Sequence, residues 1–141
     1  MNTTFISEIN WLAVLCAGLG YFVLGALWYS KVLFSGKWLQ LTKIDPKDPD
    51  ATKGMAAVML GSLFFMLLTA LGLAILQHKL QLTGGWMSGL KLGSVTGLFF
   101  GASGISSSYL YEKRATGLHF INGGYTLVGN IIAAIIICIW P

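Results

Sequence analysis

Four long apolar stretches, separated by short polar segments, account for most of this chain. The first covers residues 9–30 and contains no charged residue. The others cover residues 54–77, 86–111 and 117–140. At a rise of about 1.5 Å per residue, each stretch is long enough for a helix to cross the ~30 Å hydrocarbon core of a bilayer. We expect helices rather than strands, because an isolated strand would leave its backbone groups unpaired in lipid.

This pattern predicts an all-α integral membrane protein with four transmembrane helices in an antiparallel bundle, forming one domain over residues 1–141. The composition agrees, since 55% of the 141 residues are hydrophobic and only 10% are charged. A soluble domain carries roughly a quarter charged residues. Four spans leave no room for a soluble catalytic domain. Residues 1–8 contain no Lys or Arg, so we expect the first span to be retained rather than cleaved as a signal peptide.

The one sizeable loop, residues 31–53, begins with an amphipathic pattern. Lysines alternate there with apolar side chains, namely Leu33, Phe34, Trp38 and Leu41. The pattern is typical of a short cytoplasmic helix lying among lipid headgroups, and equally of a connector packed on the protein. Gly36 disfavours a helix at this point. Further along, Asp48 is expected to cap the second span, with Pro49 in its first turn.

Basic residues are concentrated on one side of the predicted membrane. That side carries Lys31, Lys37, Lys43, Lys47, Lys53, Lys113 and Arg114. The opposite side has Lys79, and Lys91 lies near the start of the third span. By the positive-inside rule the richer side is cytoplasmic, so both termini are expected outside. The net charge of +4 is explained by this topology, and no nucleic-acid partner is expected.

Small residues form the strongest packing pattern, a GxxxG repeat in the third predicted span. It consists of Gly89, Gly93, Gly97 and Gly101. Glycine at every fourth position allows another helix to approach closely in a membrane. The partner is either another helix of the same bundle or a second copy of the chain. The second interpretation predicts a homo-oligomer.

Polar side chains within the fourth predicted span are the candidates for a functional route. They are His119, Asn122, Tyr125, Thr126 and Asn130. Polar groups inside a bilayer point at protein or water, so these side chains either form hydrogen bonds between helices or line a path for a ligand or ion. Four spans are too few to enclose a pore, so a channel or transporter would require an oligomer.

Catalytic and metal-binding signatures are absent from the sequence. We find no HExxH motif, no Walker loop and no Cys/His cluster, and we expect no metal and no cofactor. Cys16 and Cys138 both lie in apolar runs, where a thiol usually packs as a small side chain. The remaining enzyme hypothesis combines His119, Glu112 and the serines of residues 106–108. Because catalytic signatures are absent, we expect a protein that is not an enzyme.

Two segments resemble the signatures of a known family. They are GALWYS at residues 25–30, followed by Leu33, Phe34 and Trp38, and INGGY at residues 121–125. The chain resembles a bacterial family of small four-span membrane proteins catalogued as a domain of unknown function, number seventeen sixty-one. This resemblance implies the bacterial inner membrane and names no activity. Its signature residues here are Trp28, Tyr29, Ser30, Trp38, Gly123 and Gly124.

The chain also departs from this family. Lys31 stands where a proline often follows the WYS triplet, and Thr126 stands where a histidine often follows the glycine-tyrosine pair. Both segments fall in the cytoplasmic half of the predicted topology. We therefore expect them to meet, with Trp28 or Tyr29 close to Asn122.

The function predicted from these observations is that of a small integral membrane protein of unknown molecular activity. It would self-associate through glycine-rich helix faces and act through contacts with the lipid bilayer or a partner. The alternative is a small oligomeric transporter or channel with a polar route along the fourth span.

Overall fold

The computed structural model describes residues 3–50 and 53–141, so Ala51 and Thr52 of the predicted 31–53 loop lie outside it, as do Met1 and Asn2. Every regular element in the described part is helical, which confirms the all-α prediction. The elements are η1 (Thr4–Glu8), α1 (Trp11–Trp28), α2 (Ser35–Thr42), α3 (Met55–Lys79), α4 (Trp86–Val95), η2 (Thr96–Ala102), α5 (Ser103–Tyr111) and α6 (Thr116–Ile139).

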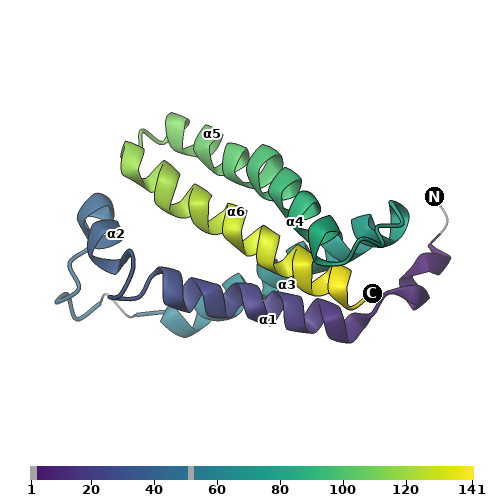
Figure 1. The fold of residues 1–141 in the computed structure, drawn as a ribbon. Helices are drawn as coiled ribbons and strands as arrows, with labels where there is room; N and C mark the ends of the chain where they lie inside the picture. Colours follow the sequence, from purple (N-terminus) through teal and green to yellow (C-terminus); the bar gives the residue numbers. More distant parts are fainter. Residues whose placement is uncertain (1–2, 51–52) are drawn as a thin grey trace.

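The long helices run along one axis of the molecule in alternating directions (Figure 1). The two termini lie at the same end, and α2 lies at the opposite end. Of the described helices, α1, α3 and α6 are each long and apolar enough to cross a membrane. The chain therefore has the helices of a membrane protein.

The third predicted span is divided into α4, η2 and α5, which follow one another without a loop. The middle segment, η2, is a π-helix. Its wider turn changes the register of the side chains, and π-helical segments are often found at functional sites. The Thr96 hydroxyl donates a hydrogen bond of 2.9 Å to the carbonyl of Leu92 at the start of this segment. Because of this division, neither α4 nor α5 is by itself long enough to span a bilayer.

Tight packing is concentrated in the half of the molecule that contains the termini. The buried core consists of Phe5, Ile9, Val14, Ala17, Tyr21, Ala70, Leu73, Ala74, Leu92, Ala133, Ala134, Ile137 and Cys138. Many of these side chains are small, so the helix backbones approach closely. The described residues of α3 before Ala70 include no buried one, and neither does α5. The half at the α2 end is therefore more open.

The ends of α1 and α3 show how the sequence sets the helix boundaries. The Asn10 side chain accepts a hydrogen bond of 3.0 Å from the Ala13 N–H, a standard N-cap for α1. The prediction that Asp48 caps the second span is wrong. Its carboxylate accepts the Asp50 N–H at 2.9 Å within the loop, and α3 begins later, after Gly54 at φ +74°.

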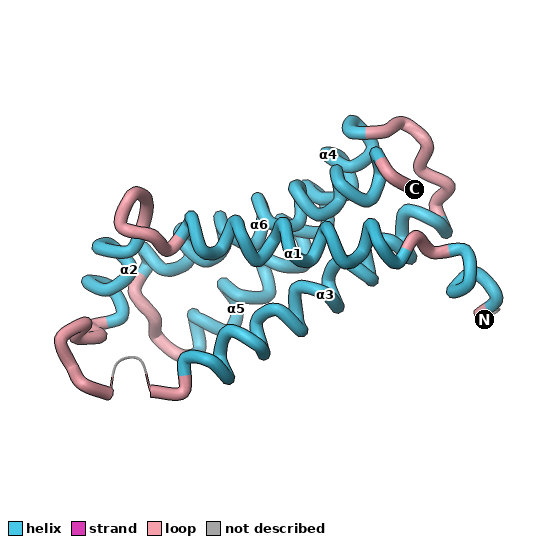
Figure 2. Tube along the Cα trace, turned by 90° about the horizontal axis from the view of Figure 1, so that it is seen from below, coloured by secondary structure: helices cyan, strands magenta, loops and turns pink. Residues whose placement is uncertain are grey.

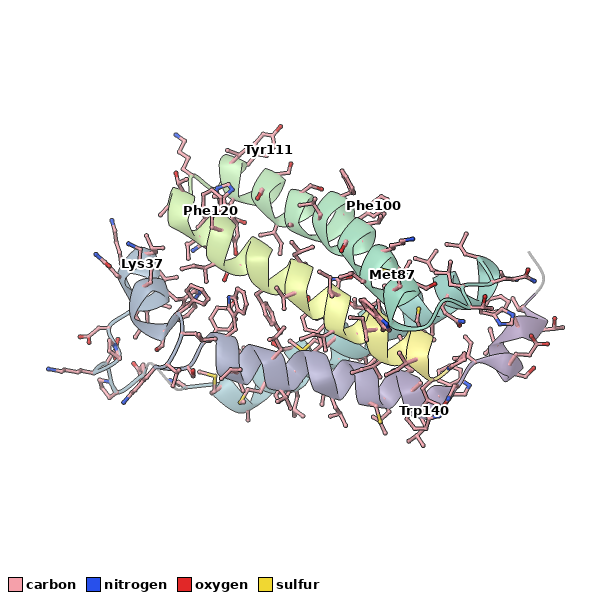
Figure 3. The ribbon with its side chains drawn as sticks, viewed as in Figure 1. Lys37, Met87, Phe100, Tyr111, Phe120 and Trp140 are labelled. Atoms are coloured by element: carbon pink, nitrogen blue, oxygen red, sulfur yellow. The ribbon has the colours of Figure 1, made fainter. Side chains whose placement is uncertain are left out.

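The short helix α2 packs against the ends of two longer helices. Leu41 lies close to Gly117 at the start of α6, where a Cβ atom would be 2.5 Å from the Leu41 Cδ1. The Trp38 ring lies 6.0 Å from that of Tyr29, at the end of α1. Lys37 points away from the protein (Figure 3). These contacts agree with the interpretation of the loop as a connector packed on the protein. The helix α2 forms even though Gly36 lies within it.

Candidate functional site

The two signature segments meet at the open end of the molecule, as predicted. The Tyr29 hydroxyl donates a hydrogen bond of 2.5 Å to the Asn122 Oδ1. One residue earlier on each segment, the Trp28 indole N–H donates to the carbonyl of Ile121 at 2.9 Å. The prediction that Trp28 or Tyr29 lies close to Asn122 is therefore confirmed. The contact joins the end of α1 to the second turn of α6.

The Asn122 side chain also extends this contact to α5. Its Nδ2 donates a hydrogen bond of 2.7 Å to the Tyr109 hydroxyl. Tyr29, Asn122 and Tyr109 thus form a directed chain in which Tyr109 accepts. A tyrosine hydroxyl has one proton to donate, and the Tyr109 proton has no acceptor in residues 3–50 and 53–141. The chain therefore ends in an available donor.

Aromatic rings surround this hydrogen-bond chain. The Tyr125 ring meets those of Tyr29 and Tyr21 edge to face, with centroid distances of 5.4 and 5.2 Å. Glycines make room for them. A Cβ atom at Gly25 would lie 2.8 Å from the Tyr125 hydroxyl oxygen, and one at Gly129 would collide with the Tyr21 ring. Close approach of ring and backbone is the physical use of glycine at these positions.

A groove of about 600 Å³ opens beside these rings. We call it the aromatic groove. It is lined by Tyr29, Ser35, Trp38, Leu39, Met55, Val58, Ser62, Ile105, Tyr109, Asn122, Tyr125 and Thr126. Its walls come from α3 and α5, which diverge from α6 toward this end of the molecule (Figure 2).

The aromatic groove shares one lining residue with a neighbouring groove closer to the middle of α6. Thr126 also lines a second groove of about 470 Å³, which extends to Asn130, Thr96 and Gly72. No charged side chain lines either groove in the described part of the chain. The two grooves are uncharged and mostly apolar, with hydroxyl and amide groups in both. Such a surface suits a ligand that is itself largely apolar.

Comparison with known proteins now identifies the family. The sequence model of the family described as "Protein of unknown function (DUF1761)" matches residues 12–138. The chain belongs to the DUF1761 family. Both signature segments lie within the matched residues, and the resemblance found in the sequence is confirmed. No curated protein matches the chain, and neither does any solved structure.

The polar residues predicted on the fourth span occupy different environments in this DUF1761 member. Asn122, Tyr125 and Thr126 line the aromatic groove. Asn130 is buried, and its Nδ2 donates to the Thr126 carbonyl at 2.8 Å. Its Oδ1 lies 3.1 Å from the Thr96 hydroxyl, which shares its one proton between this oxygen and the Leu92 carbonyl. His119 lies outside the groove with its ring 5.5 Å from that of Tyr109.

The glycine stripe of the third predicted span faces α6 of the same chain. A Cβ atom at Gly89 would lie 2.5 Å from the Ile135 Cα, and one at Gly97 would lie 2.9 Å from the Leu127 Cα. Gly93 also faces the α6 backbone, at Ile131, whereas Gly101 faces the Thr126 methyl group. The stripe is therefore occupied within the chain, and a second copy has no access to this surface.

The remaining signature residues position the segments that form the groove. The Ser30 hydroxyl donates to the Leu27 carbonyl at 2.6 Å and closes the last turn of α1, while the Trp38 ring lies beside Tyr29. Gly124 faces the Trp28 ring, and Gly123 is buried against the Ala102 methyl group. Their small size lets the α1 end and η2 approach α6.

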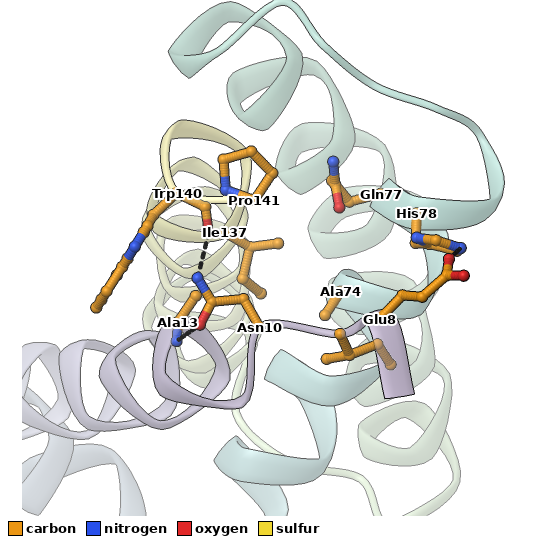
Figure 4. Close-up of a pocket in the computed structure, with 10 residues that line it drawn as sticks. Glu8, Asn10, Ala13, Ala74, Gln77, His78, Ile137, Trp140 and Pro141 are labelled. Carbon is orange, nitrogen blue, oxygen red and sulfur yellow. Dashed lines mark hydrogen bonds and ion pairs between the residues drawn. The ribbon is translucent and has the colours of Figure 1, made fainter. Parts of the chain in front are cut away.

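A smaller pocket of about 250 Å³ lies at the end of the molecule that contains the termini (Figure 4). The His78 Nε2 lies 3.2 Å from a Glu8 carboxylate oxygen at its edge. The Asn10 amide donates to the Trp140 carbonyl at 3.2 Å across it. These contacts hold η1 and the chain end against α3 and α1, which is a structural role.

The charged residues between α5 and α6 do not form the predicted enzyme-like cluster. Glu112 pairs with Arg114 at 3.0 Å instead of with His119. This hydrogen bond from Arg114 lowers the pKa of the Glu112 carboxyl below its ordinary value. The Ser108 hydroxyl also donates to Glu112, at 3.3 Å on the exposed surface.

Sequence reasoning missed two residues of this site, Tyr109 and Tyr21. Tyr109 lies close to Asn122 because α5 and α6 are neighbouring helices joined by a short turn. Tyr109 is two residues before the end of α5 and Asn122 is six residues after the start of α6, so equal spacing from the turn does not reveal this pair. Tyr21 enters through the space at Gly129, and nothing in the sequence pairs these two residues.

Proposed function

We propose that this protein is a four-span integral membrane protein that binds a membrane-soluble ligand in the aromatic groove. It acts by binding rather than by catalysis. The observation that carries the proposal is an uncharged groove, open beside helices that can cross a membrane, with an available Tyr109 hydroxyl at one end. A ligand dissolved in lipid reaches such a site without passing through water.

The continuity of α4, η2 and α5 supports a fourth span. Together they run from Trp86 to Tyr111, the boundaries predicted from hydropathy alone. Their direction is opposite to that of α6 (Figure 1). Seven of the nine basic residues belong to segments at the α2 end, so the positive-inside rule supports a cytoplasmic location for this end. Both termini are then on the outer side of a bacterial inner membrane.

The wall formed by α3 offers a direct test of ligand binding. Ser62 lines the aromatic groove, whereas Leu60 on the same helix is 69% exposed and does not line it. Ser62→Trp places an indole in the groove, and Leu60→Trp places one on the surface. Native mass spectrometry of protein extracted from membranes measures the lipid-soluble molecules that remain bound to each variant.

We expect the wild-type protein and Leu60→Trp to retain a bound molecule that Ser62→Trp has lost. Far-ultraviolet circular dichroism checks that both variants remain helical. Equal retention by Ser62→Trp would contradict the proposal, because the molecule would then be attached elsewhere on the surface. Absence of any retained molecule from the wild-type protein would contradict it as well.

A second candidate function is that of an oligomeric transporter with a route along α6. It is favoured by the way polar residues line two consecutive grooves, from Asn122 past Thr126 to Asn130. Each groove is open on one side, so a second copy of the chain would be required to close the route. The glycine stripe does not supply this contact, because it faces α6 of the same chain.

The mass of the protein in nanodiscs tests this candidate. A transporter of this kind requires a defined multiple of the 15.2 kDa of one chain. A protein that remains a monomer at all concentrations contradicts both the transporter and the homo-oligomer. Ligand binding in the groove does not depend on this result.

A further inference from the structure

We infer that the ligand of the aromatic groove is an anionic glycerophospholipid. Its ester carbonyl accepts a hydrogen bond from the Tyr29–Asn122–Tyr109 chain, one acyl chain extends along α6, and its phosphate faces the basic end of the protein. This inference rests on the proposed function, since it names the ligand of the same site.

The depth of the hydrogen-bond chain fits a lipid ester. Tyr29 is the C-cap of α1, Tyr109 is in the last turn of α5, and Asn122 is in the second turn of α6. All three positions are within about 9 Å of a helix end at a rise of 1.5 Å per residue. In the proposed orientation they lie at the boundary between headgroups and hydrocarbon, where the glycerol esters of a lipid are found.

The chemistry of the groove selects an uncharged acceptor at this depth. Tyr109 accepts from Asn122 and has its own proton to donate. An ester carbonyl accepts such a proton. A phosphate inside the groove would lose its hydration without gaining a cation, because no Lys or Arg lines the groove among the described residues.

Basic residues instead lie close in the sequence to residues that line the groove. Lys37 precedes the lining residue Trp38, and Lys53 lies two residues before the lining residue Met55. Both lysines are exposed, so their ammonium groups are able to meet an anionic headgroup. Lys113 follows α5 on the opposite wall and is also exposed.

Acidic residues at this end do not cancel the basic ones. In the loop before α3, Asp45 and Asp48 each accept a backbone N–H at 2.9 Å within the loop, and Asp50 is exposed. Glu112 is paired with Arg114. The basic residues of the end outnumber these carboxylates, so the end attracts an anion.

The second groove provides a path for an acyl chain. It continues from Thr126 between α3 and η2, where the lining includes Leu73, Leu76 and Phe100. Gly72 leaves space along this path, since a Cβ atom there would meet nothing within 4 Å. An apolar chain here covers surface that the core does not fill, next to the π-helical segment.

The test compares lipid retention from nanodiscs that contain equal amounts of phosphatidylglycerol and phosphatidylcholine with identical acyl chains. The full chain is transferred to detergent, and native mass spectrometry measures the bound lipid. We expect phosphatidylglycerol to be favoured about tenfold, the ratio expected when one or two lysines at the surface attract the anion.

Variants separate the ester contact from the charge contact. Tyr109→Phe removes the hydroxyl that accepts from Asn122 and donates to the ester, and its matched control is Tyr111→Phe, since Tyr111 is 90% exposed and does not line the groove. We expect Tyr109→Phe to lower retention of both lipids several-fold and Tyr111→Phe to have no effect.

Lys37→Gln combined with Lys53→Gln should remove the preference for phosphatidylglycerol, whereas Lys79→Gln at the other end should preserve it.

Each alternative outcome has a definite meaning. Equal retention of the two lipids, lost in Ser62→Trp, overturns this inference and leaves the proposed function in place. A preference for phosphatidylglycerol that persists in Ser62→Trp shows that the lipid is held outside the groove. This result overturns both the inference and the proposed function. An unchanged Tyr109→Phe overturns the ester contact, and a wild-type protein without bound lipid overturns the inference and the proposed function together.

Discussion

At the scale of single residues, two classes of glycine in this protein differ in what an added side chain would meet. At Gly89, Gly93 and Gly97 an added Cβ atom would meet the backbone of α6. At Gly61 and Gly104 it would meet nothing within 4 Å. Glycines of the first class set the distance between helices. At glycines of the second class, an added side chain would not disturb any contact. The same residue type therefore has opposite mutational consequences within one protein.

Gly93→Ala and Gly104→Ala test this distinction. Both positions lie in the segment from Trp86 to Tyr111. We expect Gly93→Ala to lower the free energy of unfolding by about 1 to 3 kcal/mol, because the methyl group overlaps the Ile131 backbone. Gly104→Ala should be neutral or stabilising by up to about 1 kcal/mol, since alanine favours the helix. Unfolding in mixed detergent micelles measures both, and equal effects would contradict the assigned packing.

Trp28 provides a second test at this scale. Its indole N–H donates to the carbonyl of Ile121, whereas the Trp86 side chain is 57% exposed. Trp28→Phe retains an aromatic ring and removes the donor. We expect a loss of about 1 kcal/mol in the free energy of unfolding for Trp28→Phe and no measurable change for Trp86→Phe. Equal stability of the two variants would show that the hydrogen bond does not join α1 to α6.

At the scale of elements, hydropathy predicted the helical stretches well and their local details poorly. The apolar runs ended within a few residues of α1, α3 and α6, because the need to cover hydrocarbon determines their length. Asp48 was expected to cap a helix, yet a short carboxylate can also close a turn in its own loop. The π-helical η2 was not predicted, since no hydropathy pattern distinguishes it from an α-helix.

The attachment of α2 gives a prediction for an element. Leu41 packs against Gly117 of α6, whereas Leu33 precedes α2 and is 47% exposed. We expect Leu41→Ala to increase amide hydrogen exchange throughout Ser35–Thr42, because α2 loses part of its contact with α6. Leu33→Ala should leave this exchange unchanged. Fast exchange of α2 already in the wild-type protein would show that it is not held by the protein.

At the scale of the whole molecule, the protein is closely packed at one end and open at the other. The sequence predicted the members of the open site, Tyr29 and Asn122, through two family signatures. It left the partner of the glycine stripe undecided, because a GxxxG repeat encodes a close approach and not the identity of the approaching helix. The groove itself was not predicted, since it results from the divergence of α3 and α5 from α6.

The arrangement in the membrane depends on whether the α4–η2–α5 segment crosses it. Single cysteines at Lys47, Thr83 and Ala115 test this, in a background where Cys16 and Cys138 are replaced by alanine. The three positions are exposed and lie before α3, before α4 and before α6. A maleimide that cannot cross the membrane should label Thr83→Cys on intact cells, because this end carries few basic residues. Lys47→Cys and Ala115→Cys should react only after the membrane is opened.

Labelling of Thr83→Cys and Ala115→Cys from the same side would instead leave three spans, because the segment between them would then begin and end on one face of the bilayer. The aromatic groove would in that case lack its α5 wall at the depth of the lipid esters, so this labelling pattern also decides whether the site is built inside the membrane.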